Sequence, residues 1–160
     1  MSWFEKLVPS IIRTESTEKK NSVPHGLWNK CPSCDAILFN AELVKNSNVC
    51  PKCEHHLRIS ARDRLDLFLD AEDRIEIGAN LKPSDPLKFK DSKRYKDRIT
   101  QAQKQSNESD ALVVMKGNLF GRSVVAAAFE FSYMGGSMGS VVGERFVRGV
   151  NESLRTHSPF

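Results

Sequence analysis

The chain has few cysteines and aromatic residues and no long hydrophobic run. Its 160 residues include 4 Cys, 2 Trp and 2 Tyr. No apolar stretch approaches the roughly 20 residues that cross a bilayer, which excludes a membrane-spanning helix. The amino-terminal residues 1–9 contain an early acid and only a short apolar patch, unlike the long apolar segment of a signal peptide. We therefore expect a cytoplasmic protein (or a stromal one, if the gene is plastid-borne) without a membrane partner.

Charge of either sign is not strongly in excess. The chain carries 24 Lys and Arg against 20 Asp and Glu, a net charge of +4, with 39% hydrophobic and 28% charged residues. These values are typical of a soluble globular protein with one domain and a small module. The excess is concentrated in residues 88–98, which hold six basic and two acidic residues. This run either attracts nucleic acid or phosphorylated ligands, or is a solvated helix face.

The four cysteines form two identical pairs. Cys31 and Cys34 are separated by two residues, as are Cys50 and Cys53, and a proline follows the first cysteine of each pair. Two intervening residues let both thiols of a pair point into one turn, and two such turns close a tetrahedron around one Zn²⁺. The spacing therefore predicts one structural zinc ion held by all four cysteines.

Other uses of these cysteines are less well supported. Two disulfides would require an oxidising compartment, and redox-active thiols usually occur as a single pair beside a βαβ unit. His55 and His56 follow the last cysteine and compete as ligands, but four thiolates already satisfy Zn²⁺. We expect the histidines to be partners of a sulfur atom or part of a solvated loop.

The sequence divides into three segments. Residues 1–27 are expected to be a lead segment, with a short docking helix followed by a polar, flexible stretch. Residues 28–58 are expected to form the zinc ribbon, whose folding energy comes from the metal. Residues 59–160 are expected to form an α/β domain. The apolar residues of the docking helix are Trp3, Phe4, Leu7, Ile11 and Ile12.

Local patterns predict the elements that follow the first cysteine pair. We expect a β-hairpin within residues 36–49, a helix capped by Ser60 and a short strand at residues 74–78. A second helix is expected to be capped by Ser92. Its apolar face would contain Tyr95, Ile99 and Ala102.

The last third of the chain is apolar and contains glycine-rich turns. Residues 111–120 and 123–131 are two apolar runs joined by Gly121 and Arg122, which predicts a hairpin with a type II′ turn. The second run is apolar on both faces apart from Glu130, as in a covered central strand. A helix follows, with an expected core stripe of Val142, Phe146, Val147, Val150 and Leu154.

A glycine-rich turn lies between this second run and the helix. It places backbone N–H groups at a helix N-terminus, where anions bind well. The turn is a candidate for contact with a phosphate, an amide or a thioester, although glycines also simply permit tight packing. The candidate substrate-binding residues are Gly135, Gly136, Ser137, Met138 and Gly139.

Five segments together resemble one family. They are residues 30–34, 49–56, 88–98, 110–117 and 125–143. Taken in order, they are similar to the carboxyltransferase β subunit of bacterial and plastid acetyl-CoA carboxylase, and the likeness extends over nearly the whole chain.

The resemblance implies a fold and an activity. The fold would be α/β, with a four-cysteine zinc ribbon followed by the first part of a crotonase-like (ClpP/crotonase) domain. The enzyme would move a carboxyl group from carboxybiotin, on the biotin carboxyl carrier protein, to acetyl-CoA, giving malonyl-CoA for fatty acid synthesis. A separate biotin carboxylase would load the biotin with ATP. The β subunit would pair with an α subunit in a complex of two α and two β subunits.

The sequence departs from this family in length. It ends at Phe160, about half-way through the subunit, before the later glycine turns that the resemblance implies for the oxyanion hole on the β side. The catalytic residues are therefore not identified in this sequence. We expect a truncated chain that is inactive on its own.

Two other functions stay open. Zinc ribbons often bind nucleic acid, but residues 28–64 carry a net charge of only +2, which is a weak electrostatic attraction. Weak nucleic acid binding would also be compatible with a carboxyltransferase role. Alternatively, the ribbon is a scaffold that docks on the α subunit or covers the coenzyme A site.

Overall fold

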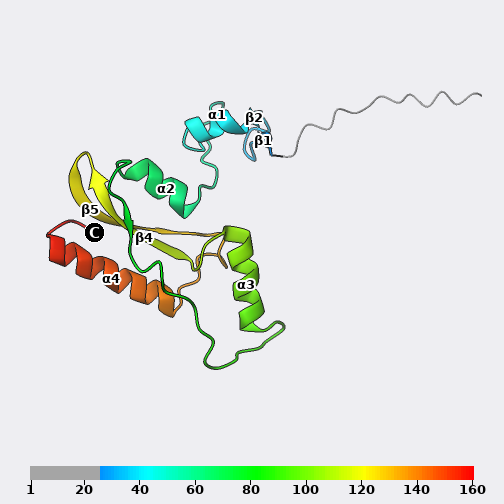
Figure 1. The fold of residues 1–160 in the computed structure, drawn as a ribbon. Helices are drawn as coiled ribbons and strands as arrows, with labels where there is room; N and C mark the ends of the chain where they lie inside the picture. The colour runs from blue at the N-terminus through cyan, green and yellow to red at the C-terminus, as the bar shows by residue number, and fades with distance from the viewer. Residues whose placement is uncertain (1–25) are drawn as a thin grey trace, which may run out of the picture.

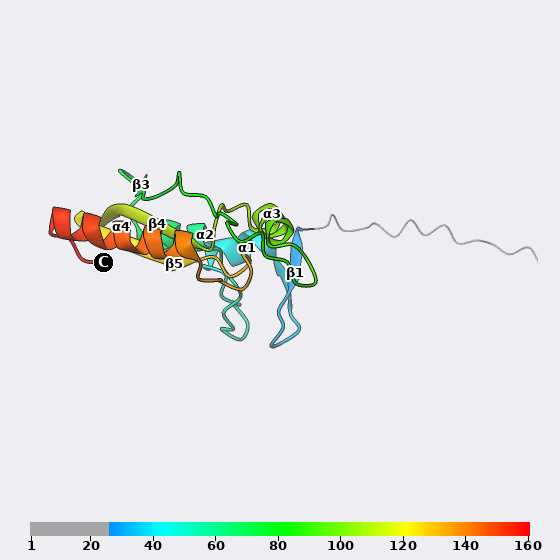
Figure 2. The same ribbon diagram turned by 90° about the horizontal axis from the view of Figure 1, so that it is seen from below.

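The computed structural model describes residues 26–160, so the predicted docking helix lies outside the described residues. The described part is elongated, with the zinc ribbon and the C-terminal end of the last helix at opposite ends (Figures 1 and 2). No helix in residues 26–160 is long and apolar enough to cross a membrane.

The ribbon is built from two short strands and one short helix. Strand β1 (Trp28–Lys30) pairs antiparallel with β2 (Ile37–Phe39), and helix α1 (Asn40–Lys45) follows at once. The prediction of a hairpin within residues 36–49 is therefore wrong, because β2 pairs with a strand that lies before this range. The first cysteine pair reverses the chain, so the partner of β2 precedes it, and the residues after β2 become a helix.

The helix after the ribbon begins where the sequence predicts. Helix α2 (Ala61–Phe68) has Ser60 as its N-cap, and the Ser60 hydroxyl accepts a hydrogen bond of 3.1 Å from the backbone N–H of Asp63. This bond satisfies one of the free donors of the first turn. Ala61 and Leu65 of α2 are buried, together with Leu69 just after it.

A three-stranded antiparallel sheet forms the centre of the domain. Its order is β3 (Ile75–Glu76), β4 (Leu112–Leu119) and β5 (Arg122–Phe129). Side chains alternate between the two faces, so α2 packs on one face and α4 (Ser140–Thr156) on the other (Figure 1). The first face contributes Val113, Met115, Val124 and Ala128, and the second contributes Leu112, Val114 and Val125.

The hairpin between β4 and β5 is shifted by one residue from the prediction. Leu119 pairs with Arg122, so the two turn residues are Phe120 and Gly121. Both have positive φ, 50° and 75°, which is a type I′ turn rather than type II′. The carboxylate of Asp70 accepts hydrogen bonds from both turn amides, at 3.1 Å and 2.8 Å, and holds Phe120 in this conformation.

Strand β5 is covered on both faces, as predicted, but it is not central. Among the described strands it lies at the edge of the sheet, beside β4 only. The backbone N–H of Val125 donates to the carbonyl of Pro159 at 3.0 Å. The C-terminal segment thus satisfies one ladder donor of this edge.

Helix α3 (Tyr95–Ser106) begins later than predicted. Its N-cap is Arg94, which makes no side-chain cap, so Ser92 is not the cap. The carboxylate of Asp91 accepts a hydrogen bond of 2.9 Å from the backbone N–H of Lys93, which holds this segment in a turn. The predicted apolar face of the helix is correct, because Ile99 and Ala102 are buried.

The predicted core stripe of α4 is wrong for most of its members. Val142 is buried, but Phe146, Val147 and Leu154 are at least half exposed, and Phe146 is contacted edge-on by the ring of Phe160, with the ring centroids 5.1 Å apart. The helix is rotated so that Arg145 faces the sheet. The buried residues of α4 are Val141, Val142, Arg145, Gly149 and Ser153.

Candidate metal centre and glycine turn

The two cysteine pairs fold into matching turns. In the first, the N–H of Cys31 donates to the carbonyl of Ala36 at 2.9 Å, and the N–H of Asp35 donates back to Cys31 at 3.0 Å. The second turn repeats both bonds at the same offsets from Cys50, each at 2.9 Å. Asp35 and its counterpart Glu54 both have positive φ, 56° and 60°. Identical spacing has produced identical backbone geometry.

The four sulfur atoms converge on one point. All Sγ atoms lie within 4.8 Å of one another. The Cys31 and Cys53 sulfurs are 3.6 Å apart, and those of Cys34 and Cys50 are 3.8 Å apart. A tetrahedron of thiolates with Zn–S bonds of about 2.3 Å has edges of about 3.8 Å. The four cysteines therefore fit one Zn²⁺ with no open position, as predicted.

The site is half buried and electrostatically uneven. Cys31 and Cys50 are fully buried, whereas Cys34 and Cys53 are exposed. Burial works against ionisation of Cys31, but backbone hydrogen bonds from Cys34 and Ser33 and the nearby thiols lower its pKa to about 7. The backbone amide of Ala36 lowers the pKa of Cys34, but the surrounding thiols and burial outweigh this effect and raise the pKa to about 12. A cation is needed to hold all the sulfurs as thiolates together.

The histidines do not join this cluster. Within residues 26–160, the group placed to hold a metal consists of the four cysteines. His55 contributes its backbone carbonyl to Cys50, and His56 forms a β-bridge with Val49. Only Leu38 and Leu43 complete the buried core of the ribbon beside Cys31 and Cys50, so the metal is its main stabilising element.

The glycine turn follows β5 and leads into α4. The N–H of Tyr133 donates to Glu130 at 3.1 Å, and the N–H of Gly136 donates to Tyr133 at 2.9 Å. Met134, Gly135 and Gly136 all have positive φ. The turn therefore has the sequence-predicted position between strand and helix, and α4 begins without a side-chain cap.

The predicted substrate-binding residues of this turn face different surroundings. Gly135 lines a surface hollow of about 600 Å³. A Cβ on Gly136 would lie 3.2 Å from the ring of Phe131, so this glycine has a packing role. Met138 is 82% exposed, and a Cβ on Gly139 would meet nothing within 4 Å. The contact of these residues with a substrate stays a prediction.

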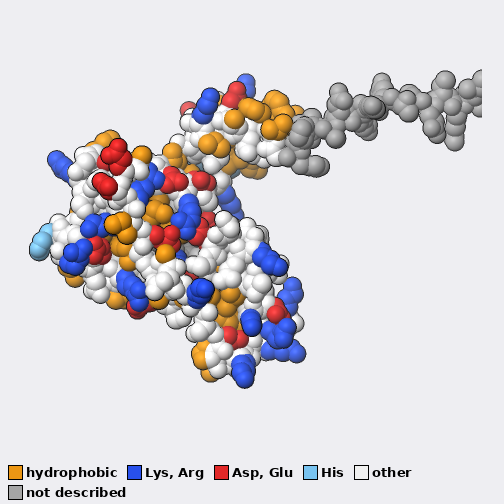
Figure 3. Space-filling view, viewed as in Figure 1, with side chains coloured by type: hydrophobic (Ala, Val, Ile, Leu, Met, Phe, Trp, Pro, Cys, Tyr) orange, Lys and Arg blue, Asp and Glu red, His pale blue; other side chains and the backbone are white. Residues whose placement is uncertain are grey.

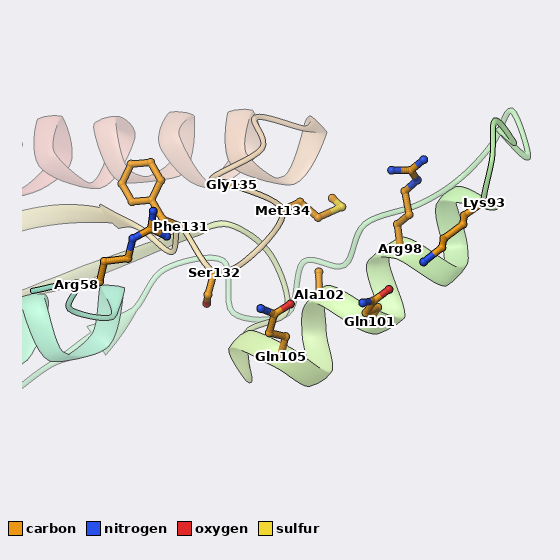
Figure 4. A pocket seen from close by; sticks show the side chains of 10 residues that line it. All are labelled: Arg58, Lys93, Arg98, Gln101, Ala102, Gln105, Phe131, Ser132, Met134 and Gly135. Atoms are coloured by element: carbon orange, nitrogen blue, oxygen red, sulfur yellow. The ribbon is translucent and has the colours of Figure 1, made fainter. Parts of the chain in front are cut away.

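The hollow brings together segments that are far apart in the sequence. Figure 4 shows Arg58 and Phe131 at one end, Lys93 and Arg98 at the other, and side chains of α3 between them. No carboxylate lines it. The complete set is Arg58, Lys93, Arg98, Gln101, Ala102, Gln105, Phe131, Ser132, Met134 and Gly135.

Sequence reasoning did not connect these basic residues with the glycine turn. Lys93 and Arg98 belong to the basic run of residues 88–98, which gathers around the start of α3 (Figure 3). Arg58 follows the ribbon without any periodic signal. Only the packing of α3 beside the end of β5 shows that they share one hollow with the turn.

The fold and the metal centre define a class of protein, an α/β protein with an N-terminal four-cysteine zinc ribbon. Residues 28–53 match the family model described as the acetyl-CoA carboxylase zinc finger domain. The ribbon is thus similar to the zinc finger domain of acetyl-CoA carboxylase. This agrees with the resemblance of the longer motifs to the carboxyltransferase β subunit.

Two solved structures are similar to part of the chain. Both are crystal structures of transcarboxylase 12S, one with methylmalonyl-coenzyme A and methylmalonic acid bound, the other with hydrolysed methylmalonyl-coenzyme A bound. Each is 29% identical to this chain, with a TM-score of 0.49. Each match covers 64% of this chain and 18% of the transcarboxylase chain. The chain therefore corresponds to a minor part of those proteins.

Proposed function

We propose that the chain belongs to the β subunit of an acetyl-CoA carboxylase carboxyltransferase. In this role it takes part in moving a carboxyl group from carboxybiotin to acetyl-CoA, which gives malonyl-CoA. Its partners are the α subunit, the biotin carboxyl carrier protein and biotin carboxylase, which consumes the ATP. The complex works in the cytoplasm or the plastid stroma.

The observation that carries the proposal is the match of the ribbon to the acetyl-CoA carboxylase zinc finger. The convergence of the four sulfurs supports it, because the matched residues also form the geometry that this domain requires. The longer motifs in residues 88–98, 110–117 and 125–143 extend the same resemblance over the α/β part.

The chemistry of the proposed reaction assigns different roles to the two parts of the chain. A zinc ion with four thiolate ligands has no position for a substrate, so the ribbon has a structural role. The methyl group of acetyl-CoA must lose a proton, and negative charge then develops on the thioester oxygen. Backbone N–H groups can stabilise that charge without a side-chain nucleophile. The resemblance places the β-side donors in later glycine turns, and the N–H groups at the start of α4, beside Gly139, would instead contact another carbonyl or anionic group of acetyl-CoA.

A chimera tests the proposal directly. Residues 26–160 would replace the corresponding part of a characterised carboxyltransferase β subunit, and the product would be purified with its α subunit. We expect one zinc ion per β chain and formation of malonyl-CoA from acetyl-CoA and carboxybiotin. A chimera that folds, binds zinc and assembles with the α subunit, but forms no malonyl-CoA where its parent does, would contradict the proposal.

A further inference from the structure

Two neighbouring hollows form a groove beside the glycine turn. The first has a volume of about 600 Å³, and the second has about 500 Å³. Arg58, Phe131 and Ser132 line both, so the two lie next to each other at the end of β5. We call this the basic groove. The volume of each hollow is in the range of small-molecule binding sites.

The groove has an excess of positive charge. Arg64 lines the second hollow, which brings the cationic residues to four with Arg58, Lys93 and Arg98. The one carboxylate that lines either hollow is Glu130, and it is 6% exposed. Its oxygens already accept hydrogen bonds from protein groups, which makes it a poor counter-ion for the groove.

Three of the four cations are not neutralised by neighbouring acids. In residues 26–160, Arg58, Arg64 and Lys93 form no ion pair, and all three are exposed. Arg98 differs, because its Nη2 atom donates to both carboxylate oxygens of Asp91 at 2.6 Å. The charge available to a ligand in the first hollow therefore comes mainly from Arg58 at one end and Lys93 at the other (Figure 4), and Arg64 adds to it in the second hollow.

Neutral groups between these cations complete a surface for a nucleotide. Gln101 and Gln105 of α3 line the floor and can both donate and accept hydrogen bonds. The Phe131 ring is 63% exposed and offers a flat apolar face. An aromatic face beside guanidinium and ammonium groups is the combination that holds a base together with its phosphates.

We propose that the basic groove binds the phosphate-bearing nucleotide end of coenzyme A, with Arg58 and Lys93 as the main phosphate contacts. The inference rests on the proposed function, because it assigns a place to the same thioester substrate. Gly135 borders the groove, so a ligand anchored there lies beside the glycine turn. The groove then contributes binding and position, and the reacting thioester lies outside it.

Calorimetric titration of the zinc-loaded 160-residue chain tests this proposal. The ligands are coenzyme A, adenosine 3′,5′-diphosphate and pantetheine, which lacks the nucleotide. Arg58→Gln and Lys93→Gln should each weaken coenzyme A binding about three- to tenfold, the effect of losing one charge-assisted contact at a partly solvated site. The same variants should weaken adenosine 3′,5′-diphosphate similarly and leave pantetheine unchanged.

The matched control is Arg122→Gln, which removes a guanidinium from the start of β5, outside the groove. It should bind all three ligands as the unmodified chain does, and the Cys-bound zinc of each variant should stay at one ion per chain. Equal affinity of coenzyme A for Arg58→Gln, Lys93→Gln and the unmodified chain would overturn the proposal, as would an absence of coenzyme A binding.

Single-stranded RNA is the alternative ligand for a groove with basic and aromatic residues. Its binding is measured in a second set of titrations. If Arg58→Gln and Lys93→Gln weaken binding of a single-stranded RNA of 12 nucleotides but not of coenzyme A, the groove binds nucleic acid and the proposal is wrong. The outcome is independent of the chimera assay. If the chimera forms malonyl-CoA but Arg58→Gln and Lys93→Gln bind coenzyme A as the unmodified chain does, the groove proposal alone is refuted. If both variants weaken coenzyme A binding but the chimera transfers no carboxyl group, the proposed function alone is refuted.

Discussion

The carboxylate of Glu130, at the end of β5, accepts a hydrogen bond of 2.9 Å from the backbone N–H of Ala61 in the first turn of α2. The other carboxylate oxygen accepts from the N–H and the hydroxyl of Ser132, at 3.0 Å and 2.6 Å. One buried acid therefore caps a helix 69 residues away and also fixes the start of the glycine turn. The favourable interaction of an anion with a helix N-terminus adds to these bonds.

We expect Glu130→Gln to destabilise the domain at neutral pH by about 1–3 kcal/mol, because a charge-assisted acceptor is lost. Burial raises the pKa of Glu130, but hydrogen bonds from Ser132 and Ala61 outweigh it and leave the pKa below its ordinary value. The contribution of the carboxylate is therefore present above its unfolded pKa of about 4.3 and is lost as the pH falls through the folded pKa. Urea unfolding at pH 7 and at pH 3 measures this. A difference between the two proteins that is equally large at both pH values would contradict it.

Arg145 is expected to be the most sensitive charged residue of α4. It is fully buried, its Nε donates to the carbonyl of Gly78 at 3.2 Å, its Nη1 donates to Leu112, and its Nη2 donates to Ser109 at 2.7 Å. Arg145→Met should cost about 3 kcal/mol or more, because several buried acceptors lose their donor. The free energy of unfolding in urea provides the measurement.

The matched control for this change is on the same helix. Arg148 is partly exposed, and its Nε donates to Glu144 at 2.8 Å, one turn away. Arg148→Met should cost no more than about 0.5 kcal/mol, the usual value for such a surface pair. Similar losses for Arg145→Met and Arg148→Met would show that the buried contacts of Arg145 do not stabilise the domain.

Zinc binding should depend on each of the four cysteines. Cys50→Ser is expected to lower the zinc content from one ion per chain to nearly none and to unfold the ribbon, because folding of the ribbon and metal binding are coupled. Ser33→Ala, in the same type of turn but without a ligand role, should retain the metal. Elemental analysis of natively purified protein gives the answer, and full occupancy in Cys50→Ser would refute the assignment.

Alanine substitutions at two neighbouring glycines distinguish the cost of backbone strain from the cost of a steric contact. Gly135 and Gly136 have φ of 70° and 78°, so an alanine at either position should cost about 1–2 kcal/mol from the left-handed conformation alone. Only a Cβ on Gly136 meets Phe131, at 3.2 Å. Gly136→Ala should therefore destabilise the domain more than Gly135→Ala, by thermal or urea unfolding. Equal losses of stability in the two variants would mean that the Phe131 ring moves away from the added Cβ at little cost.

The sequence predicted the features that depend on local spacing. The four zinc ligands, the Ser60 cap and the buried face of α3 were all recovered, because each is determined by residues within a turn or two of one another. The predictions that failed required knowledge of a distant partner. The strand that pairs with β2, the edge position of β5 and the rotation of α4 all depend on what packs beside them.

The cysteine spacing by itself determined the metal centre, since two residues between thiols permit only one compact turn and two such turns make one tetrahedron. Hydrophobic periodicity alone predicted that Phe146, Val147 and Leu154 of α4 lie in the core, and this prediction was wrong. Only the tertiary structure turned Arg145 inward instead, because the carbonyls of Gly78 and Leu112 and the hydroxyl of Ser109 supply acceptors that no local pattern reveals. The basic groove was likewise decided by packing, because the segments that precede α2 and α3 bring Arg58 and Lys93 to opposite ends of one hollow beside the end of β5.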